Sequence, residues 1–409
     1  MKNIGHIDPE NIRDYLGAGG YEGLKKALSM EPAAVIEAVV DSGLRGRGGA
    51  GFPSGLKQRF TNDSRPGCRE RYVVVNADEG EPGTFKDRVI MEQDPHLYLE
   101  GTIIAAYAIG ASQAYIYIRG EYYESIRKTQ KAIDDAYAAG FLGKDILGSG
   151  YSLDVGIKLG AGSYLCGEEL TMLESLEGKR GNPRIKPPFP AEKGAFNKPT
   201  LVNNVETLAN IPLIIARGQE WYRGIGTGDS PGTKIFTISG QVEKPGCYEL
   251  PMGVSLRQLI ELAGGMRGGK SFKSALLGGA AGTFVDESML DTPMSFDKLR
   301  EKGATLGSGA VIVMAEGDSV YDILHNCLRF FRHESCGKCV PCRVGTTQLV
   351  RKADKLRNGQ PGREKLLSEM LRESEVMAAT SLCPLGQSPI LPVESAIRYF
   401  KKELLDGEA

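Results

Sequence analysis

Three cysteines lie close together in the run Cys336-Gly-Lys-Cys339-Val-Pro-Cys342. This C-x2-C-x2-C spacing lets one compact loop point three thiolates inward, as ligands of a single metal centre. A tetrahedral zinc ion and an iron–sulfur cluster both need four ligands. Zinc sites more often use two C-x2-C pairs or a mixture of Cys and His, whereas three clustered cysteines with a distant fourth are typical of iron–sulfur proteins.

The best fourth ligand is Cys383, which Pro384 follows, as Pro follows the last cysteine of bacterial ferredoxin runs. The chain between Cys342 and Cys383 is long enough for helices that return it to the same place. The other thiols are scattered singly, and Cys327 lies in a stretch that is typical of a helix. We therefore predict that the metal ligands are Cys336, Cys339, Cys342 and Cys383.

A glycine-rich loop is the second candidate for chemistry. The letters Gly46-x-Gly48-x-x-Gly51 match a dinucleotide-binding fingerprint, which requires a strand before it and a helix after it. Here a helix is expected before the loop, and Pro53 follows it. The sequence therefore argues against a conventional Rossmann turn.

The loop still has features that suit an anion. Successive glycines let backbone N–H groups approach a phosphate closely, and Arg45, Arg47 and Lys57 add positive charge. Phe52 and Phe60 offer flat faces to a nicotinamide or a flavin. The alternative is a mobile surface loop.

Polar side chains follow the expected strand 71–76. Asn76, Asp78, Glu79 and Glu81 come at its end, and α/β sheets bind ligands at the carboxyl ends of their strands. Because these carboxylates repel one another, at least one should face a donor or a cation. The alternative is an exposed acidic turn.

Three further stretches resemble parts of a ligand site. The glycine turn 160–167 leads to the N-terminus of a helix, which suits a phosphate. Glu168 and Glu169 stand at that N-terminus, and the alternative for them is simple N-capping, which the helix dipole favours. The Pro- and Gly-rich stretch 180–198 is expected to form a lid or a wall. Residues 201–208 are expected to open a helix, where Asn203 and Asn204 either read the edge of an amide-rich ring or cap the helix.

Composition sets the wider limits. The chain has 409 residues, which predicts two or three domains. A hydrophobic fraction of 41% and a charged fraction of 25% are typical of globular proteins. The formal net charge of −1 gives no reason to expect nucleic-acid binding. No long apolar segment or signal peptide is visible, and the thiols favour a cytoplasmic location.

Hydrophobic patterns predict an α/β fold followed by two other units. A linker at 224–232 precedes a small α+β unit, to which we assign a packing or spacer role, and the chain ends in helices. Residues 8–42 are expected to be helical, with a further helix that opens at Glu31-Pro32. The other expected helices are 96–110, 121–139, 254–263, 319–333, 344–358, 363–373 and 389–405, and the expected strands are 71–76, 114–118, 152–159, 233–239, 275–277 and 311–314.

Six motifs, in this order, resemble those of one family. The chain is similar over nearly its whole length to the NADH-binding flavoprotein subunit of respiratory NADH:quinone oxidoreductase (complex I). It is equally similar to the corresponding subunits of NAD-linked soluble hydrogenases and formate dehydrogenases. The motifs are 43–57, 76–83, 160–169, 186–189, 203–207 and 334–343.

The resemblance implies three domains and three cofactors. Residues 1–225 would form a Rossmann-like α/β domain that binds FMN and NAD(H), residues 233–316 a ubiquitin-like (SLBB-type) α+β domain, and residues 317–409 a helical bundle that holds a 4Fe-4S cluster. This arrangement requires the glycine-lined hollow to lie near the cluster sulfurs. Partners would be a thioredoxin-like 2Fe-2S subunit and a further iron–sulfur subunit.

The resemblance also implies a division of roles among the residues. Glu81 would be the catalytic polar contact to the nicotinamide. FMN would be bound by Gly46, Arg47, Gly48, Lys57, Asn76, Asp78, Glu79, Gly167, Glu168, Asn203, Asn204 and Thr207. Gly49 and Gly51 would also belong to the cofactor site. NAD(H) would be flanked by Phe52, Phe60 and Phe189, with polar contacts from Glu81, Glu169 and Lys186.

Two other functions remain open from the sequence. One is the NAD(H)-binding subunit of an electron-bifurcating complex, which depends on clusters in partner chains. The other is a zinc-stabilised module that binds a nucleotide without redox activity.

Overall fold

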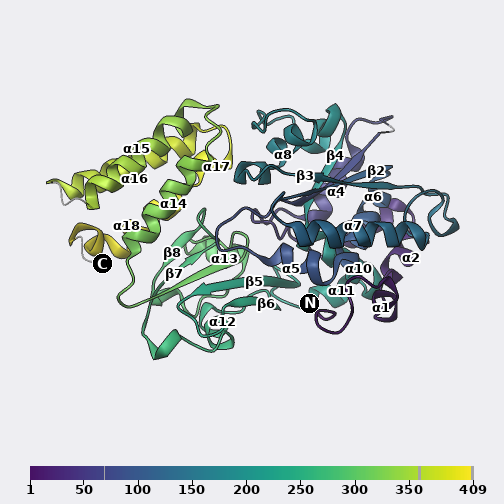
Figure 1. The fold of residues 1–409 in the computed structure, drawn as a ribbon, viewed down its shortest axis with the longest axis horizontal. Helices are drawn as coiled ribbons and strands as arrows, with labels where there is room; N and C mark the ends of the chain where they lie inside the picture. The colour runs from purple at the N-terminus through teal and green to yellow at the C-terminus, as the bar shows by residue number, and fades with distance from the viewer. Residues whose placement is uncertain (69, 358–360, 407–409) are drawn as a thin grey trace.

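The computed structural model describes residues 1–68, 70–357 and 361–406. Figure 1 shows three parts: an α/β part that holds the N-terminus, a smaller part with a second sheet, and a group of long helices that ends the chain. Within the described residues, no helix combines the length and the apolar character needed to cross a membrane.

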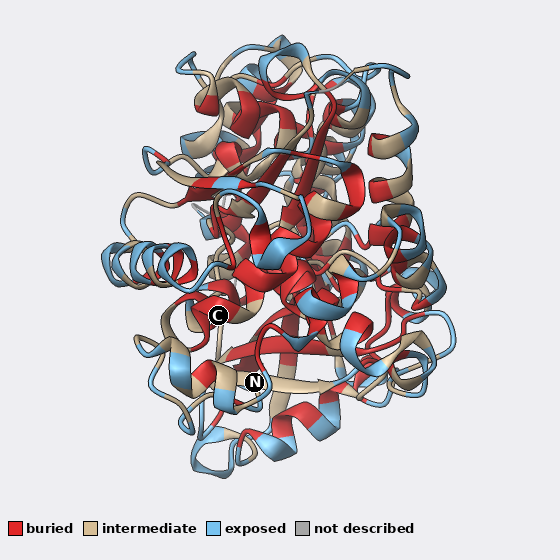
Figure 2. Cartoon of the chain, turned by 90° about the vertical axis from the view of Figure 1, so that its right-hand side faces the viewer, coloured by how far each residue is buried: buried red, intermediate tan, exposed pale blue. Residues whose placement is uncertain are grey.

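The first sheet has four parallel strands in the order β3-β2-β1-β4. Figure 2 shows buried residues, in red, gathered in the interior of the chain. Val73 and Val75 belong to one core and Val74 to another, as the alternation of side chains along a strand requires. Both faces of the sheet are therefore covered. The strands are β1 (Tyr72–Ala77), β2 (Gln113–Ile118), β3 (Asp154–Leu159) and β4 (Thr200–Asn204).

Helices cover this sheet and complete the first part. They are α1 (Ile12–Gly17), α2 (Glu22–Leu28), α3 (Pro32–Asp41), α4 (Ser54–Asp63), α5 (Lys86–Gln93), α6 (Pro95–Ile109), α7 (Tyr123–Ala138), α8 (Glu169–Leu176), α9 (Pro190–Lys193), α10 (Val205–Arg217) and α11 (Gln219–Arg223). The α/β prediction for this part is confirmed.

Two local predictions were wrong. Residues 200–204 form strand β4 rather than the start of a helix, and α10 begins only after Asn204, whose side chain accepts from Glu206 N. The stretch is too short for its pattern to reveal a strand, and pairing with β1 decides it. Helix α4 does follow the glycine loop, directly after Pro53. The element before the loop is α3, so the loop still differs from a Rossmann turn.

The second part is a five-stranded mixed sheet in the order β6-β5-β9-β7-β8. Strands β5 and β9 are parallel, and the other pairs are antiparallel. The elements are β5 (Thr233–Gly240), β6 (Gly246–Pro251), α12 (Leu256–Leu262), β7 (Phe272–Leu277), β8 (Thr283–Val285), α13 (Phe296–Glu301) and β9 (Ala310–Ala315). The sequence predicts three of these strands and misses β6 and β8.

The third part is helical, as predicted. Helix α15 begins four residues earlier than expected and therefore includes Cys342; its predicted end, Asn358, lies outside the described residues, as do 407–409. The helices are α14 (Val320–Glu334), α15 (Val340–Arg357), α16 (Arg363–Thr380), α17 (Pro384–Gln387) and α18 (Ile390–Asp406). They share one core, which also contains the four cysteines predicted as metal ligands.

Candidate functional site

The glycine loop is a closed turn between α3 and α4. Gly46 N donates to Phe52 O at 2.8 Å, and Arg45 pairs with Pro53 in an isolated antiparallel bridge. Gly51 has a φ of +66°, a left-handed conformation that favours glycine. A Cβ on Gly48 would lie 3.0 Å from Asn204 Cβ. The loop backbone therefore packs directly against the end of β4.

Arg47, which was predicted to bind FMN, directs its guanidinium at groups of the protein, and its contact with FMN stays a prediction. Its side chain is fully buried, and its guanidinium donates to Thr233 O at 3.0 Å, Pro231 O at 2.7 Å and Tyr222 OH at 3.1 Å. Its backbone N donates to Thr207 Oγ1 at 2.8 Å. Arg47 thus fastens the glycine loop to the segment 231–233 and to Thr207.

The carboxyl ends of β1 and β4 lie side by side, because these strands are parallel neighbours with Asn76 opposite Asn204. The side chain of Asn76 donates to Gly167 O at 2.8 Å. This bond ties the turn before α8 to the same edge of the sheet. Three of the predicted motifs therefore converge where α/β sheets bind ligands.

These motifs enclose a cavity of about 900 Å³, which falls in the range of ligand pockets. Most of the predicted binding residues line it: Gly46, Gly48, Gly49, Gly51, Phe52, Lys57, Phe60, Asn76, Gly167, Glu168, Glu169, Lys186, Phe189, Asn203, Asn204 and Thr207. Arg47, Asp78, Glu79 and Glu81 are not among its lining residues.

An ion network crosses one wall of the cavity. Lys57 Nζ lies 3.0 Å from Glu169, and Lys186 Nζ lies 2.8 Å from Glu168 and 2.9 Å from Glu169. Burial raises the pKa of Glu169, but Lys57 and Lys186 outweigh it and bring the pKa down to about 2. Glu168 also caps α8, which is the alternative role that the sequence allowed. The network joins α4, α8 and the Pro-rich segment.

Three aromatic side chains mark the open side of the cavity. Phe52, Phe60 and Phe189 are about half exposed, although they are large and apolar. The ring centroids of Phe52 and Phe60 lie 6.4 Å apart. Exposed aromatic faces beside a pocket suit a flat ring that stacks on them.

Asp78 lies behind the cavity with an unused oxygen. Its Oδ2 is buried and has no hydrogen-bond partner, and a Cβ on the lining residue Gly167 would lie 3.9 Å from it. Burial raises the pKa of Asp78 to about 7, against a smaller opposing effect of Arg119. A buried acceptor without a donor is costly, so this oxygen is available to a ligand hydroxyl.

Glu79 and Glu81 both have hydrogen-bond partners within the protein. Glu79 caps α5, accepting from Lys86 N and Asp87 N at 2.9 Å. Glu81 accepts from Tyr164 OH at 2.6 Å and from Ala281 N at 3.0 Å. Both carboxylates have partners within the protein, and Glu81 joins the first two parts of the structure. The role of Glu81 as a catalytic contact to the nicotinamide stays a prediction.

The four predicted cluster ligands lie in or against the core of the helical part. Cys342 and Cys383 are buried, whereas Cys336 and Cys339 are half-buried. Gly386 brings α17 to α15, because a Cβ there would lie 2.9 Å from Cys342 Cβ. Among the described residues, no three His, Cys, Asp or Glu side chains are grouped to hold one metal ion; in a four-iron cluster the ligands are spread over several irons.

The cavity extends to the residue beside one predicted cluster ligand. Pro384, the residue after Cys383, lines it. From the other side, Lys338 Nζ donates to Pro183 O at 2.7 Å, which joins the cysteine loop to the Pro-rich segment. Sequence reasoning missed Pro384 as a lining residue, although it stands next to a predicted ligand. It also missed Ser64, Arg65 and Thr200, for which no motif gives a signal, whereas Ala191 and Glu192 fall in the stretch expected to form a lid or a wall.

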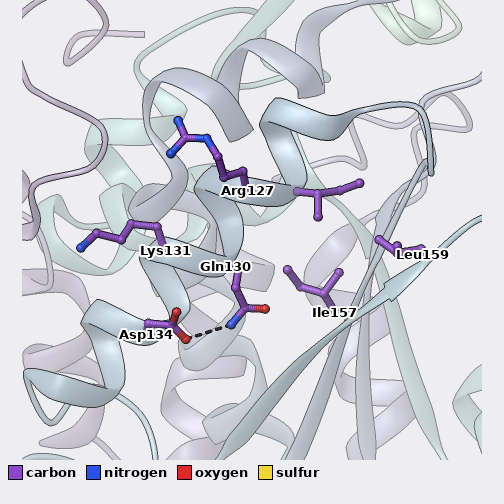
Figure 3. Close-up of a pocket in the computed structure, with 7 residues that line it drawn as sticks. Arg127, Gln130, Lys131, Asp134, Ile157 and Leu159 are labelled. Carbon is purple, nitrogen blue, oxygen red and sulfur yellow. Dashed lines mark hydrogen bonds between the residues drawn. The ribbon is translucent and has the colours of Figure 1, made fainter.

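A second cavity, of about 550 Å³, lies between α7 and the edge strand β3 (Figure 3). Gln130 donates to Asp134 there at 2.9 Å. Its cations are already paired, Arg127 with Glu10 and Lys131 with Asp135. None of the predicted binding residues lines it, so the first cavity is the candidate site.

Comparison with known proteins places this site in a class of flavin- and iron–sulfur-dependent oxidoreductases. Residues 39–213 match the Nuo51 FMN-binding domain, residues 235–280 match the SLBB domain, and residues 322–407 match the NADH-ubiquinone oxidoreductase-F iron-sulfur binding region. The three matches follow the three parts of the structure in order.

Relatives match nearly the whole chain. An NADH-quinone oxidoreductase subunit of Rhizobium meliloti is 46% identical, over 99% of this chain and 96% of its own length. The corresponding NADH-quinone oxidoreductase subunit of Aquifex aeolicus is 48% identical, over 96% of this chain and 90% of its own. NADP-reducing hydrogenase subunit HndC of Solidesulfovibrio fructosivorans is 45% identical, over 98% and 81%.

A solved structure of NAD+-reducing [NiFe]-hydrogenase superposes with a TM-score of 0.87 at 38% identity, over 95% of this chain. This chain spans 65% of that hydrogenase chain. The protein belongs to the family formed by these NADH-quinone oxidoreductase subunits and their hydrogenase counterparts. It is an NADH dehydrogenase flavoprotein subunit with FMN- and 4Fe-4S-binding domains, and this replaces the zinc alternative.

Proposed function

We propose that the cavity holds FMN against the glycine loop, with NAD(H) at its open side, and that Cys336, Cys339, Cys342 and Cys383 bind the cluster. The chemistry that these groups supply when bound is hydride transfer between NAD(H) and FMN and single-electron transfer to the cluster. The observation that carries the proposal is the shared wall: one cavity is lined both by the glycine loop and by the residue after Cys383.

The cavity residues divide into two groups under this proposal. The backbone of the glycine loop approaches the flavin phosphate, and the free oxygen of Asp78 takes a ribityl hydroxyl. Asn76, Asn203, Asn204 and Thr207 bond the flavin ring or chain. Phe52, Phe60 and Phe189 flank the nicotinamide dinucleotide, with Lys186 and Glu169 as polar contacts. These residues bind, orient and exclude water, and no side-chain nucleophile is needed.

The purified protein is expected to contain FMN, iron and acid-labile sulfide, and to reduce ferricyanide with NADH. Absorption spectra, metal analysis and steady-state rates measure these properties. The same assay with NADPH shows which dinucleotide is preferred. A correctly folded preparation that is colourless and contains zinc instead of iron would contradict the proposal.

A Gly48→Ala variant tests the glycine loop. The added Cβ would push Asn204, which it would approach to 3.0 Å, and such overpacking costs about 1–3 kcal/mol. We expect FMN to bind about tenfold more weakly, as measured by fluorescence titration of the FMN-free protein. Gly228→Ala is the matched control, because a Cβ there meets nothing within 4 Å. Equal affinities in the two variants would remove Gly48 from the site.

We propose that electrons leave toward partner subunits, namely a thioredoxin-like 2Fe-2S subunit and a further iron–sulfur subunit. The relatives are named as subunits. Val340 and Val344, beside Cys339 and Cys342, are 58% and 46% exposed, which leaves an apolar surface at the cluster. Affinity purification followed by mass spectrometry is expected to recover these partners; recovery of the chain alone, active with its native acceptor, would contradict this.

We further propose a cytoplasmic location, with any membrane contact made through partners. None of the eight cysteines, all of which the structure describes, forms a disulfide, which suits a reducing compartment. Cell fractionation tests this location. Release of the protein with periplasmic contents would exclude it.

A further inference from the structure

Four charged side chains are buried together between the first and second parts of the structure. This buried quartet consists of Lys86, Asp87, Glu206 and Lys234, whose side chains are at most 5% exposed. Lys86 Nζ lies 2.7 Å from Asp87 and 2.9 Å from Glu206, and Lys234 Nζ lies 2.6 Å from Glu206. Each charge therefore has an opposite partner, as burial requires.

The quartet holds the side chain of Asn204, which lines the cavity. Asn204 Oδ1 accepts from Lys86 Nζ at 3.2 Å and from Glu206 N at 3.1 Å, and its Nδ2 donates to Asp87 at 2.6 Å. A reversed amide would face the Lys86 ammonium with its own N–H₂ group. The orientation of this amide at the cavity wall is therefore set by the quartet.

Lys234 reaches this group from the second part, whereas the other three residues belong to the first. It starts from β5, and its Nζ also donates to Ile235 O at 2.8 Å, while Ile235 N donates to Glu206 at 2.7 Å. Gly309 makes room for it, because a Cβ there would lie 2.8 Å from Lys234 Cε. The second part thus does more than the packing role expected from sequence.

The quartet contains two cations and two anions. Two further buried groups face the quartet: Glu79, whose pKa burial raises to about 7, lies beside Lys86 and Asp87, and Arg47 lies near Lys234. Since both are present with and without Lys234, loss of the Lys234 charge makes this buried region one unit more negative just behind the cavity wall. Charges interact strongly where water is excluded, so this change would disfavour adding electrons to a flavin bound at Asn204. Loss of Glu206 would leave an excess positive charge and act in the opposite direction.

We propose that Lys234 is a positioning residue for the flavin reaction: through Glu206 and Lys86 it fixes the Asn204 amide at the flavin and balances the charge behind it. The inference rests on the proposed function, because it requires FMN in this cavity. It makes the small α+β part a determinant of how readily the flavin is reduced.

The test is the midpoint potential of the bound flavin, titrated spectroscopically in the holoenzyme. Because burial lowers the pKa of Lys234 to about 7, the titration is done at about pH 6, where this side chain is charged. We expect Lys234→Met to shift the reduction equilibrium at least tenfold toward the oxidised flavin, which is about 30 mV for a two-electron couple. Glu206→Gln is expected to raise the potential instead. The double variant, which removes one charge of each sign, is expected to return toward the wild type.

Lys270→Met, an exposed lysine of the same part, is the matched control and should leave the potential unchanged. A purely structural role would not give opposite shifts for the two single variants. An unchanged potential in Lys234→Met would overturn the inference. If Lys234→Met does not fold, the flavin potential of Glu206→Gln is the test. An unchanged potential in Glu206→Gln would likewise overturn the inference. Wild-type protein that binds no FMN would instead refute the proposed function.

Discussion

Replacing Cys383 with alanine is expected to abolish the electron paramagnetic resonance signal of the reduced 4Fe-4S cluster while FMN stays bound. Cys383 is buried and lies immediately before α17, which Gly386 holds against Cys342. With three thiolates the cluster lacks a ligand. The flavin cavity loses at most the contact of Pro384. The variant should remain yellow and lose electron transfer to any acceptor that depends on the cluster.

Cys327→Ala is the matched control. Cys327 is another buried cysteine of the same helical core, on α14. Its replacement removes a similar volume but should preserve the cluster signal and the iron content. A full signal in Cys383→Ala, with loss in Cys327→Ala, would show that the fourth ligand was wrongly chosen.

Replacing Asp78 with asparagine is expected to stabilise the FMN-free protein and to weaken FMN binding. Burial raises the pKa of Asp78 from 3.8 to about 7, so the folded state holds its proton more tightly than the unfolded state. Folding stability is therefore lost as the pH rises between these two values, by roughly 4 kcal/mol at most. Asparagine has no charge to bury and avoids this loss.

Thermal unfolding of the FMN-free proteins measures the first effect. The melting temperature of Asp78→Asn should exceed that of the wild type at about pH 8, and the difference should shrink as the pH falls toward about 4. FMN affinity should fall about tenfold or more, because a charge-assisted hydrogen bond contributes about 1.5–3 kcal/mol. The exposed control Asp63→Asn should show neither effect. A destabilised Asp78→Asn protein at high pH would contradict this reading of the site.

The sequence predicted most of the fold where hydrophobic periods are long. Helices such as α6 and α7 and the buried strands β1 and β2 follow their patterns closely. Strand β4 was missed because five residues carry too little pattern, and its conformation depends on pairing with β1. Strands β6 and β8 were missed as well, and they too are defined by their partners in the second sheet.

The candidate site was predictable where residue type alone limits the role. Glycines at 46, 48 and 51, paired asparagines and clustered cysteines have few other uses, and the cavity or the helical core contains them. Charged residues were harder, since a sequence does not show which partner a charge will find. Arg47 and Glu81 resemble ligand contacts by position, but carbonyl groups satisfy the first and a tyrosine and an amide satisfy the second. The role of Lys234 could not be predicted, because Glu206, with which it pairs, lies far from it in the sequence.

The anchoring of Arg47 has a consequence for dividing this protein into pieces. Its guanidinium bonds carbonyl oxygens of Pro231 and Thr233, which lie beyond the predicted domain end at residue 225. A fragment cut at that point would retain every residue of the glycine loop. The buried guanidinium of Arg47 beneath the loop would, however, lose these carbonyl partners. A fragment meant to bind flavin should therefore end downstream of β5, so that Arg47 keeps its bonds to Pro231 and Thr233.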